Sequence, residues 1–255
     1  MIDMRRTWRF LPRNALIWLT ALAVPLAAAR PAFAVTYLEQ AERLQLINAF
    51  LLDYSAAAAP RLPKQSLFEL QADLIPMPVI DNRVGAKDEP DHAPSTVPRI
   101  RARYLASWGL MLGATAAPGV KLRGFTAPSQ GGEAGLRFAL GSLHGEARAF
   151  TLHALVTGPI TETGASDQFE MTNSGADLRF GWALGSIMPY AGSGQGHTAS
   201  TLTVAADGTR LKAEADYRYV FGGLTWFRGP LTFTVEQHRT EDFLDHLILA
   251  VSIRF

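Results

Sequence analysis

The 255-residue sequence predicts an all-β fold: a transmembrane, antiparallel, up-and-down β-barrel of about ten strands, preceded by an amino-terminal amphipathic helix. Three observations predict it. Most of the chain after residue 62 alternates apolar and polar residues with a period of two, which indicates strands with one apolar face. Turns rich in glycine, proline and aspartate separate these strands. Beyond the first 34 residues no apolar run reaches the roughly 18 residues of a membrane helix, so a spanning fold has to be a closed barrel.

The amino terminus has the three parts of a secretory signal peptide. Four arginines within the first 13 residues form a basic region, and Ala15–Ala29 is an apolar run that is short for a spanning helix. The small residues around Phe33 fit a cleavage site, so we predict that residues 1–34 are removed after Ala34. Cleavage at Ala29 is a second candidate, and an uncleaved anchor is the alternative.

Charge and cysteine content exclude several functional classes. Residues 1–34 hold five arginines and one aspartate, so acidic residues outnumber basic ones by three in the rest of the chain. This balance does not favour a nucleic-acid partner. The chain has no cysteine, which excludes disulfides, thiolate metal sites and cysteine nucleophiles.

Residues 35–62 are predicted to form a periplasmic amphipathic helix. Thr36 and Glu39 match a capping box. Apolar residues then recur at three- and four-residue steps, which indicates one apolar stripe along a helix. The stripe consists of Tyr37, Ala41, Leu44, Ile47, Leu51 and Tyr54. Three positions remain open for this helix: plugging the lumen, lying on the inner leaflet surface, or packing on a periplasmic partner. We expect a packed amino-terminal helix with no separate role.

The barrel is expected to span residues 63–255. The clearest strand in the middle of the chain runs from Ile100 to Leu112 in one piece. The other strands are expected around residues 68–74, 120–124, 136–140, 150–156, 178–184, 190–205, 213–221, 231–235 and 243–255. Eight or twelve strands also fit, because the strands at Val120 and after Pro189 are weak. Each strand has about the length that a tilted membrane strand needs.

The connections between these strands predict an orientation. Counting back from the carboxy terminus, short turns at 115–119, 143–145, 186–189 and 228–230 fall at one end. The two longest loops, 76–98 and 158–174, fall at the other end, together with a hairpin turn at Asp207-Gly208. Short turns face the periplasm in bacterial barrels, whereas long loops face outward.

Charged residues on the polar face are expected to line the lumen. The candidates are Arg101, Arg103, Arg123, Arg137, Asp177, Arg179, Glu214, Asp216, Arg218 and Glu236. Charges inside and apolar residues outside suit a membrane barrel; a soluble periplasmic sandwich or lipocalin-like barrel, with the apolar face inside, is the alternative. Side chains fill the lumen of a small barrel, so we expect opposite charges to pair across strands and close it. A narrow, arginine-lined channel for anions is the competing interpretation.

No catalytic residue, cofactor or metal site is predicted. His153 and His238 are the histidines expected to face inward, but an isolated inward histidine is more often a hydrogen-bonded core residue than a catalyst. Gly192–Gly196 alternates glycine with Ser193 and Gln195, as a nucleotide-binding loop does. Such a loop opens a helix, whereas a strand follows here. We therefore interpret these glycines as part of a crowded or bent barrel wall.

The last thirteen residues carry the clearest alternation. Leu247, Leu249, Val251, Ile253 and Phe255 share one face, and the chain ends on an aromatic residue. This stretch resembles the closing strand of small bacterial outer-membrane β-barrel proteins, a loose class with many uncharacterised members. The resemblance implies a Gram-negative outer membrane as the location. It also implies that Phe255, with Ile253 and Val251, forms the signal read by the barrel-assembly machinery.

The resemblance implies two partners, outer-membrane lipid and the assembly machinery, while a surface ligand stays unknown. We expect a non-enzymatic structural, surface-interaction or cell-envelope role. A narrow, porin-like pore or transporter for small polar solutes is the alternative. A lipid-modifying barrel enzyme is a third hypothesis, although no residue matches a motif of those enzymes.

Overall fold

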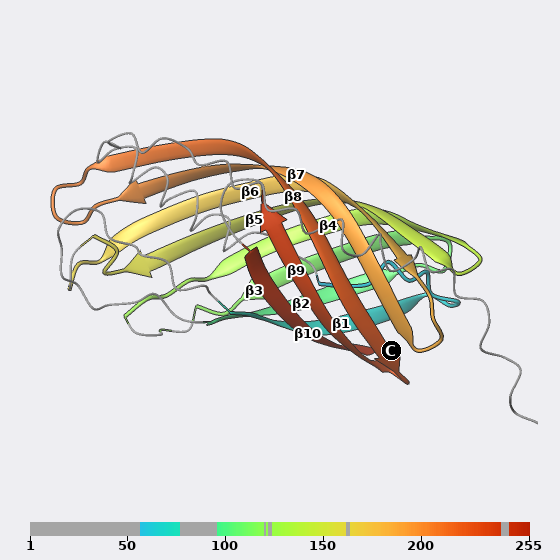
Figure 1. Cartoon of the computed structure of the whole chain (residues 1–255). Coiled ribbons are helices and arrows are strands. Elements are labelled where there is room, and N and C mark those ends of the chain that lie inside the picture. Colours follow the sequence, from blue (N-terminus) through green and yellow to red (C-terminus); the bar gives the residue numbers. More distant parts are fainter. Residues whose placement is uncertain (1–56, 77–95, 120, 122–123, 162–163, 241–244) are drawn as a thin grey trace, which may run out of the picture. The chain divides into compact units, whose positions relative to one another are not determined.

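The computed structural model describes residues 57–76, 96–119, 121, 124–161, 164–240 and 245–255. They belong to the compact unit Thr36–Phe255. Ten strands make up this part of the chain (Figure 1): β1 Leu67–Pro76, β2 Thr96–Leu105, β3 Leu110–Ala117, β4 Ser129–Leu140, β5 Leu143–Gly158, β6 Asp167–Trp182, β7 Ile187–Thr203, β8 Arg210–Arg228, β9 Leu231–Thr240 and β10 Asp245–Arg254. The predicted signal peptide and residues 35–56 of the predicted helix lie outside the described residues.

The strands form a closed, antiparallel, up-and-down barrel, as predicted. Every strand pairs with its neighbours in the sequence, and β1 pairs with β10 to close the wall. The carboxy terminus takes part in this closure, because the backbone N–H of Phe255 donates to the carbonyl of Phe68 at 2.9 Å. Among the described residues there is no helix long and apolar enough to cross a membrane.

The predicted strand from Ile100 to Leu112 was wrong, because it is two strands. The chain turns between Leu105 and Leu110, where Gly109 adopts a φ of 109°. This turn has four residues, an even number, so the outward-facing positions on either side stay in phase and Tyr104 pairs with Leu112. The period of two therefore runs through the turn without a break.

The strand predicted at residues 120–124 was also wrong. Its described residues, Lys121 and Gly124, lie in the connection between β3 and β4. The two errors offset each other, which leaves the count at ten. They also move the connection at residues 115–119 to the end with the long loops, and put the turn at residues 106–109 at the end with the short turns.

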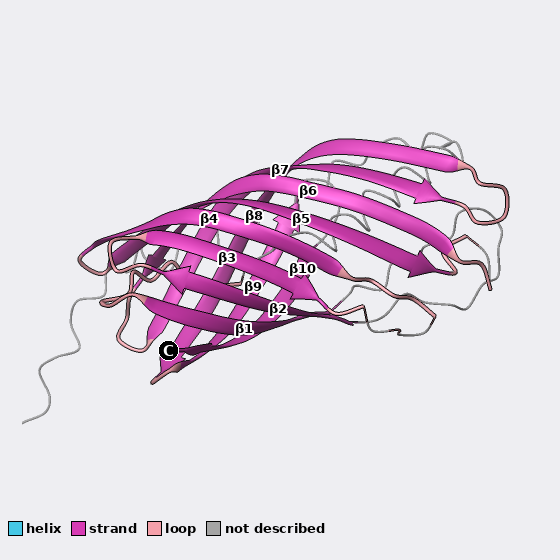
Figure 2. Cartoon of the chain, turned by 180° about the vertical axis from the view of Figure 1, so that it is seen from behind, coloured by secondary structure: helices cyan, strands magenta, loops and turns pink. Residues whose placement is uncertain are grey.

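Four strands are much longer than the others. β5 to β8 have 16, 16, 17 and 19 residues, whereas the remaining strands have 8 to 12. The pairing of β8 with β9 ends at Tyr219, so Arg210–Arg218 rises beyond β9 (Figure 2). We call the upper parts of these four strands the extension; it comprises residues 149–158, 167–176, 195–203 and 210–218. The remainder of the barrel is called the closed part.

The extension corrects two predictions. A membrane strand needs about 9–11 residues, so these four strands are not near spanning length throughout. Residues 167–174, predicted as loop, belong to β6. Gln168, Glu170 and Thr172 point outward there, and this polar face was taken for a loop.

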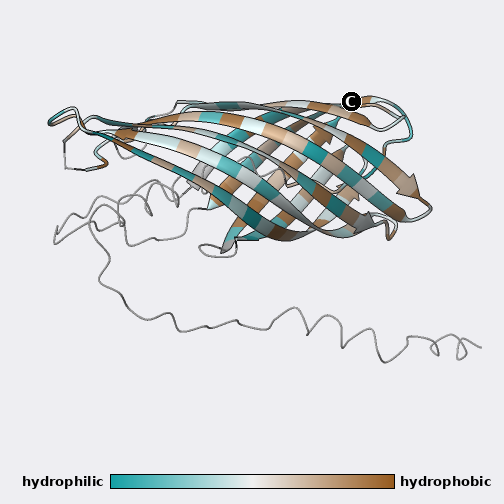
Figure 3. Cartoon of the chain, turned by 90° about the horizontal axis from the view of Figure 1, so that it is seen from above, coloured by the Kyte–Doolittle hydropathy of each residue, from teal (hydrophilic) through white to brown (hydrophobic). Residues whose placement is uncertain are grey.

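The closed part is apolar on its outer face. Polar and apolar residues alternate along its strands (Figure 3), and the apolar ones point outward. The exposed aliphatic residues include Leu70, Leu74, Ile100, Leu112, Leu136, Leu178, Val220, Leu224, Val235, Leu249 and Val251. We call this set the apolar belt.

A second exposed set, which is aromatic, lies at the short-turn end of the barrel. It contains Phe68, Trp108, Phe138, Phe180, Trp182, Trp226 and Phe233. Neighbouring rings approach one another across strands, with centroids 5.2 Å apart for Phe68 and Tyr104 and 5.6 Å apart for Trp226 and Phe233. Aromatic girdles of this kind mark the membrane–water interface in membrane barrels.

Candidate functional site

Inside the closed part lies a layer of buried charge. Its described members are the arginines Arg99, Arg101, Arg103, Arg137, Arg148 and Arg179 and the acidic residues Glu69, Asp73, Glu133, Glu146, Asp177 and Glu236. Each of these residues is at most 6% exposed. Positive and negative groups are equal in number, so the layer has no formal excess charge. We call it the ion-pair layer.

On the β1–β2 side, each carboxylate of the layer has an arginine within ion-pair distance. Arg101 Nη2 lies 3.1 Å from Asp73 Oδ2, and Arg103 Nη2 lies 3.0 Å from Glu69 Oε1. Glu69 also accepts a hydrogen bond of 2.7 Å from Arg254 Nε, across the seam that closes the barrel. Charged side chains therefore connect the first and last strands where the barrel closes.

On the β4–β6 side, the arginines bridge several carboxylates. Arg148 donates from Nη1 to Glu133 at 2.9 Å and from Nε to Asp177 at 3.1 Å. Arg179 Nε lies 3.2 Å from Glu146 Oε1, and its guanidinium also approaches Asp177 at 3.4 Å. Such shared partners make the pairs a connected network, in which removing one member affects several others.

Strand register explains how the sequence builds this network. Glu69 faces Arg103 directly across β1 and β2, and Glu146 faces Arg179 across β5 and β6. Directly opposite residues on neighbouring strands have Cβ atoms about 4.5–5.5 Å apart, which is the reach of an ion pair. The lumen pairing thus follows from charges of opposite sign at matched inward positions.

A cluster of histidines and aromatic rings contacts the ion-pair layer at Glu236. Tyr190 donates from its hydroxyl to Glu236 Oε2 at 2.5 Å, and His238 bonds the other oxygen of the same carboxylate. The ring of His238 stacks on His246 with 5.0 Å between centroids, and on Phe221 with 5.1 Å. His238 is therefore a hydrogen-bonded, stacked interior residue, but it is not isolated, because His246 is buried beside it.

The glycines of Gly192–Gly196 make room for the rings of β8. Gly192, Gly194 and Gly196 face inward and lie directly opposite Phe221, Tyr219 and Tyr217. A Cβ on Gly194 would lie 2.4 Å from the Tyr219 ring. The ring of Tyr219 thus packs directly on the backbone of Gly194. The interpretation of these glycines as part of a crowded wall fits the structure.

The chain before β1 runs inside the barrel. The backbone N–H of Leu62 donates to His144 Nδ1 at 3.2 Å, near the short-turn end. The carbonyl of Ala58 accepts from Arg179 Nη1 at 2.8 Å, and that of Ala57 accepts from Gln71 at 3.1 Å. Residues 57–62, the described part of the predicted helix, have no helical backbone, and Ala57–Ala59 are buried. We call residues 57–62 the lumen segment.

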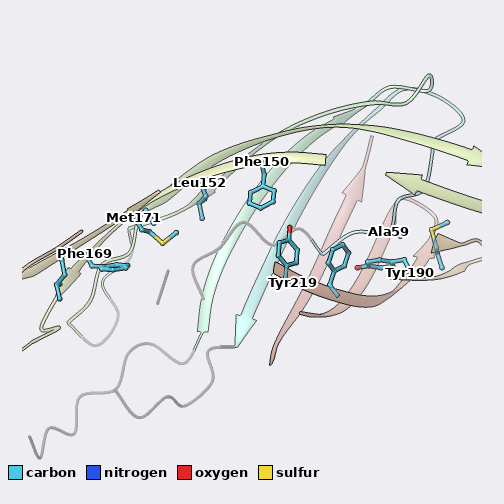
Figure 4. Packing of buried hydrophobic residues seen from close by; sticks show 11 residues of the cluster. Ala59, Phe150, Leu152, Phe169, Met171, Tyr190 and Tyr219 are labelled. Atoms are coloured by element: carbon cyan, nitrogen blue, oxygen red, sulfur yellow. The ribbon is translucent and has the colours of Figure 1, made fainter. Parts of the chain in front are cut away.

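The interior of the extension is mainly apolar, although Asn173, Thr198 and Ser200 are also buried there. Its row of buried side chains runs on from Ala59 and Tyr190 past Tyr219 to Met171 and Phe169 (Figure 4). The outer face of the extension is polar instead, with Glu170, Lys212, Glu214, Asp216 and Arg218 exposed. The polarity of the inner and outer faces is therefore reversed relative to the closed part.

Asp167 joins strands at the top of the extension. Its carboxylate accepts from the backbone N–H and the hydroxyl of Thr161, both at 2.7 Å, and from the backbone N–H of Ala205 at 2.8 Å. Burial alone would raise the pKa of Asp167, but these hydrogen bonds outweigh it and hold the pKa below its usual range. The carboxylate therefore stabilises the extension in its charged form.

Six predicted lumen residues lie in the ion-pair layer: Arg101, Arg103, Arg137, Asp177, Arg179 and Glu236. Arg123 lies outside the described residues. The prediction for Glu214, Asp216 and Arg218 was wrong, because all three are exposed on the outer face of the extension. The rings of β8 point inward there, and the charged side chains face solvent on the outer side of the wall.

His153 also departs from expectation, because its side chain is 44% exposed and lies near Thr172 on the outer face. The lumen candidates predicted from the sequence did not include Glu133, Glu146, Arg148 and Arg99, nor Glu69 and Asp73. An inward position of Glu133 and Glu146 could have been predicted. Glu133 lies four residues before Arg137 on the same face of β4, and Glu146 is paired directly with Arg137.

The arrangement fits a closed, charged interior better than a reaction site. Glu236 and His238 are buried, at 0% and 1% exposed, within the barrel rather than at its rim. Among the described residues, no group of three or more histidines and acidic residues is arranged to hold a metal ion. The lumen segment and the ion pairs occupy the space that a solute would cross.

Comparison with known proteins gives similarity of fold only. No family model matches the chain, and no curated protein matches it. The translocator domain of autotransporter NalP from Neisseria meningitidis is similar at 12% identity and a TM-score of 0.43, over 85% of this chain and 95% of that one. Neisserial surface protein A is similar at 10% identity and a TM-score of 0.33, over 73% and 95%. The N-terminal β-barrel domain of Pseudomonas aeruginosa OprF is similar at 11% identity and a TM-score of 0.34, over 75% and 98%.

Proposed function

We propose that this chain is an integral protein of the bacterial outer membrane, with a closed lumen and a non-enzymatic role in envelope structure or surface interaction. The apolar belt carries the proposal. Leu136 is 59% exposed, Leu178 53% and Val220 55%, on three different strands. A soluble monomer rarely exposes a contiguous apolar surface that encircles it, whereas lipid solvates such a surface.

Two further observations support this location. The aromatic set lies at the short-turn end, where a membrane interface is expected. The outer face becomes polar along the extension, which supports a position of the extension in water on the opposite side. Its exposed charges of both signs, such as Glu214 and Arg218, suit contact with a partner at the cell surface.

The closed lumen supports the structural role over transport. Twelve charged side chains of the ion-pair layer and the lumen segment fill the interior at the level of the belt. A narrow anion pore remains the alternative, and the arginines of the layer favour it. Such a pore requires the lumen segment to move aside, so it predicts a conductance that depends on this segment.

The test is membrane partition combined with heat-modifiability. The full chain and a form without Phe255 are expressed, the outer membrane is isolated, and boiled and unboiled samples are compared on a gel. We expect the full chain in the outer-membrane fraction with a mobility shift, and less of both without Phe255. A soluble periplasmic protein without a shift would refute the proposal.

A further inference from the structure

A groove of about 610 Å³ lies on the outer wall of the closed part, over the junction of the first and last strands. It crosses β8, β9, β10, β1 and β2 and ends at Pro118, which follows β3. Most of its lining side chains belong to the apolar belt or to the aromatic set, among them Leu74, Ile100, Leu224, Trp226, Phe233 and Leu249. The groove is therefore a hollow in the surface that the proposed location puts in lipid.

Ala72 lies in the middle of the groove. On the neighbouring strands it faces Val251 and Ile100, and along β1 it lies between the outward-facing Leu70 and Leu74. All four neighbours are larger aliphatic residues, so the methyl side chain of Ala72 leaves a depression between them. The atoms around such a depression lose dispersion contacts unless another apolar group fills it.

The groove runs obliquely up the wall. On β8 its lining residues Leu224 and Trp226 lie close to the short-turn end, whereas on β2 Pro98 and Ile100 lie close to the long-loop end. Six adjacent strands, each about 4.8 Å from the next, give the groove a length of about 24 Å. Strands of membrane barrels tilt by about 35–45°, so a line across them rises by about 15 Å, which is half of the roughly 30 Å hydrocarbon core. The groove therefore matches the depth of one leaflet.

A cation lies at the short-turn end of the groove. Arg228 is exposed at the end of β8, and its Cζ atom lies 5.7 Å from the centroid of the Trp226 ring. A guanidinium that stacks on an aromatic ring presents its N–H groups at the edge of the stack, where they can donate to a phosphate. The groove thus combines an apolar channel with a phosphate-binding group at one end.

We infer that the groove binds one acyl chain of a glycerophospholipid, with the phosphate of the headgroup at Arg228. The site rests on the proposed function, because the short-turn end then lies at the periplasmic leaflet of the outer membrane. A second copy of the chain fits less well, since its apolar belt is aliphatic and brings no anion to Arg228. The bound chain covers the junction of β1 and β10 from outside, where Arg254 and Glu69 connect the same strands from inside.

Native mass spectrometry of the detergent-purified full chain, titrated with palmitoyl-oleoyl phosphatidylglycerol, tests the groove. We expect the wild type to bind one molecule saturably. Ala72→Phe fills the groove and should weaken binding by about tenfold or more, because lost contact with two CH₂ groups already accounts for such a factor. Ala147→Phe is the matched control and should bind as the wild type does, since Ala147 also faces outward between two aliphatic residues, Leu136 and Leu178.

Arg228→Gln tests the headgroup separately. One cation near an anionic lipid surface contributes a factor of about five to lipid affinity, so this variant should bind phosphatidylglycerol about fivefold more weakly. Lys64→Gln is its control and should bind as the wild type does, because Lys64 is an exposed cation that precedes β1 outside the groove. Since Arg228 is exposed, the variant also serves as the test if Ala72→Phe does not fold.

The outcomes separate this site from the proposed function. Equal lipid binding by all variants, in protein that keeps its heat-modifiability, overturns the site and leaves the membrane location intact. Tighter binding of lipid A than of phosphatidylglycerol also overturns it, because the groove then serves the outer leaflet. A wild-type dimer that Ala72→Phe dissociates does so too, since a second copy then fills the groove. A wild-type chain that is soluble and not heat-modifiable refutes the site and the proposed function together.

Discussion

Arg179→Ala is the substitution that probes the ion-pair layer most sharply. The Arg179 side chain is fully buried, lies 3.2 Å from Glu146 and 3.9 Å from Glu236, and donates to the carbonyl of Ala58. Its guanidinium also lies 4.8 Å from the centroid of the Phe221 ring. Alanine would leave three carboxylates, those of Glu146, Asp177 and Glu236, and the carbonyl of Ala58 short of a partner inside the lumen.

The expected cost follows from this geometry. Removing one partner of a buried ion pair costs about 3–5 kcal/mol, because an uncompensated charge stays in a medium of low dielectric. Arg218→Ala is the matched control, since both arginines are expected lumen residues by sequence but Arg218 is exposed on the extension. A surface substitution of this kind changes the free energy of unfolding by no more than about 0.5 kcal/mol.

Urea unfolding of the refolded barrel in detergent micelles, followed by tryptophan fluorescence, measures both variants. The unfolding midpoint should fall strongly for Arg179→Ala at an unchanged slope, and remain near wild type for Arg218→Ala. Adding Glu146→Ala to Arg179→Ala should recover about 0.5–3 kcal/mol, because the pair is coupled. Equal costs for the two arginines, or no recovery in the double variant, would refute the reasoning.

Three further predictions test the wall and the extension. Gly194→Ala places a Cβ 2.4 Å from a packed tyrosine ring, so it should cost about 1–3 kcal/mol in the same unfolding assay. Leu178→Arg on the apolar belt should cost about 2–4 kcal/mol in lipid vesicles, whereas Thr172→Arg on the extension should cost almost nothing; equal costs would argue against the membrane boundary drawn here. The lowered pKa of Asp167 means that its stabilisation is present above the unfolded pKa of about 3.9 and is lost as pH falls through the folded pKa. Asp167→Asn should therefore reduce amide protection in the extension at pH 7, and the difference from wild type should shrink at pH 2; a difference independent of pH would contradict this cause.

The fold class could be predicted because the period of two holds in every strand of the closed part. The exact strand boundaries could not, since alternation is insensitive to a turn with an even number of residues. The turn at residues 106–109 shows this, because Tyr104 and Leu112 stay in phase across it. Gly109 was the local residue that indicated this turn. A glycine within a strand can equally mark a bulge, a bend or the close approach of another backbone.

The lumen side chains could be predicted only where the outer face of the wall is apolar. There, the charged face is the inner one, as at Arg101 and Arg179. The outer face of the extension is polar, so the charge of Glu214 and Asp216 does not indicate a direction. The pairing of the β8 rings with inward glycines is set by packing between two strands, which appears in the sequence only when the register of the strands is known.

The most direct test of the closed lumen is the conductance of the purified, refolded protein in a planar lipid bilayer. The ion-pair layer and the lumen segment predict insertion without steady conductance steps. They further predict that Arg179→Ala, which releases the carbonyl of Ala58, produces brief openings. A stable, reproducible open channel from the wild-type protein would contradict the account and establish the pore as its function.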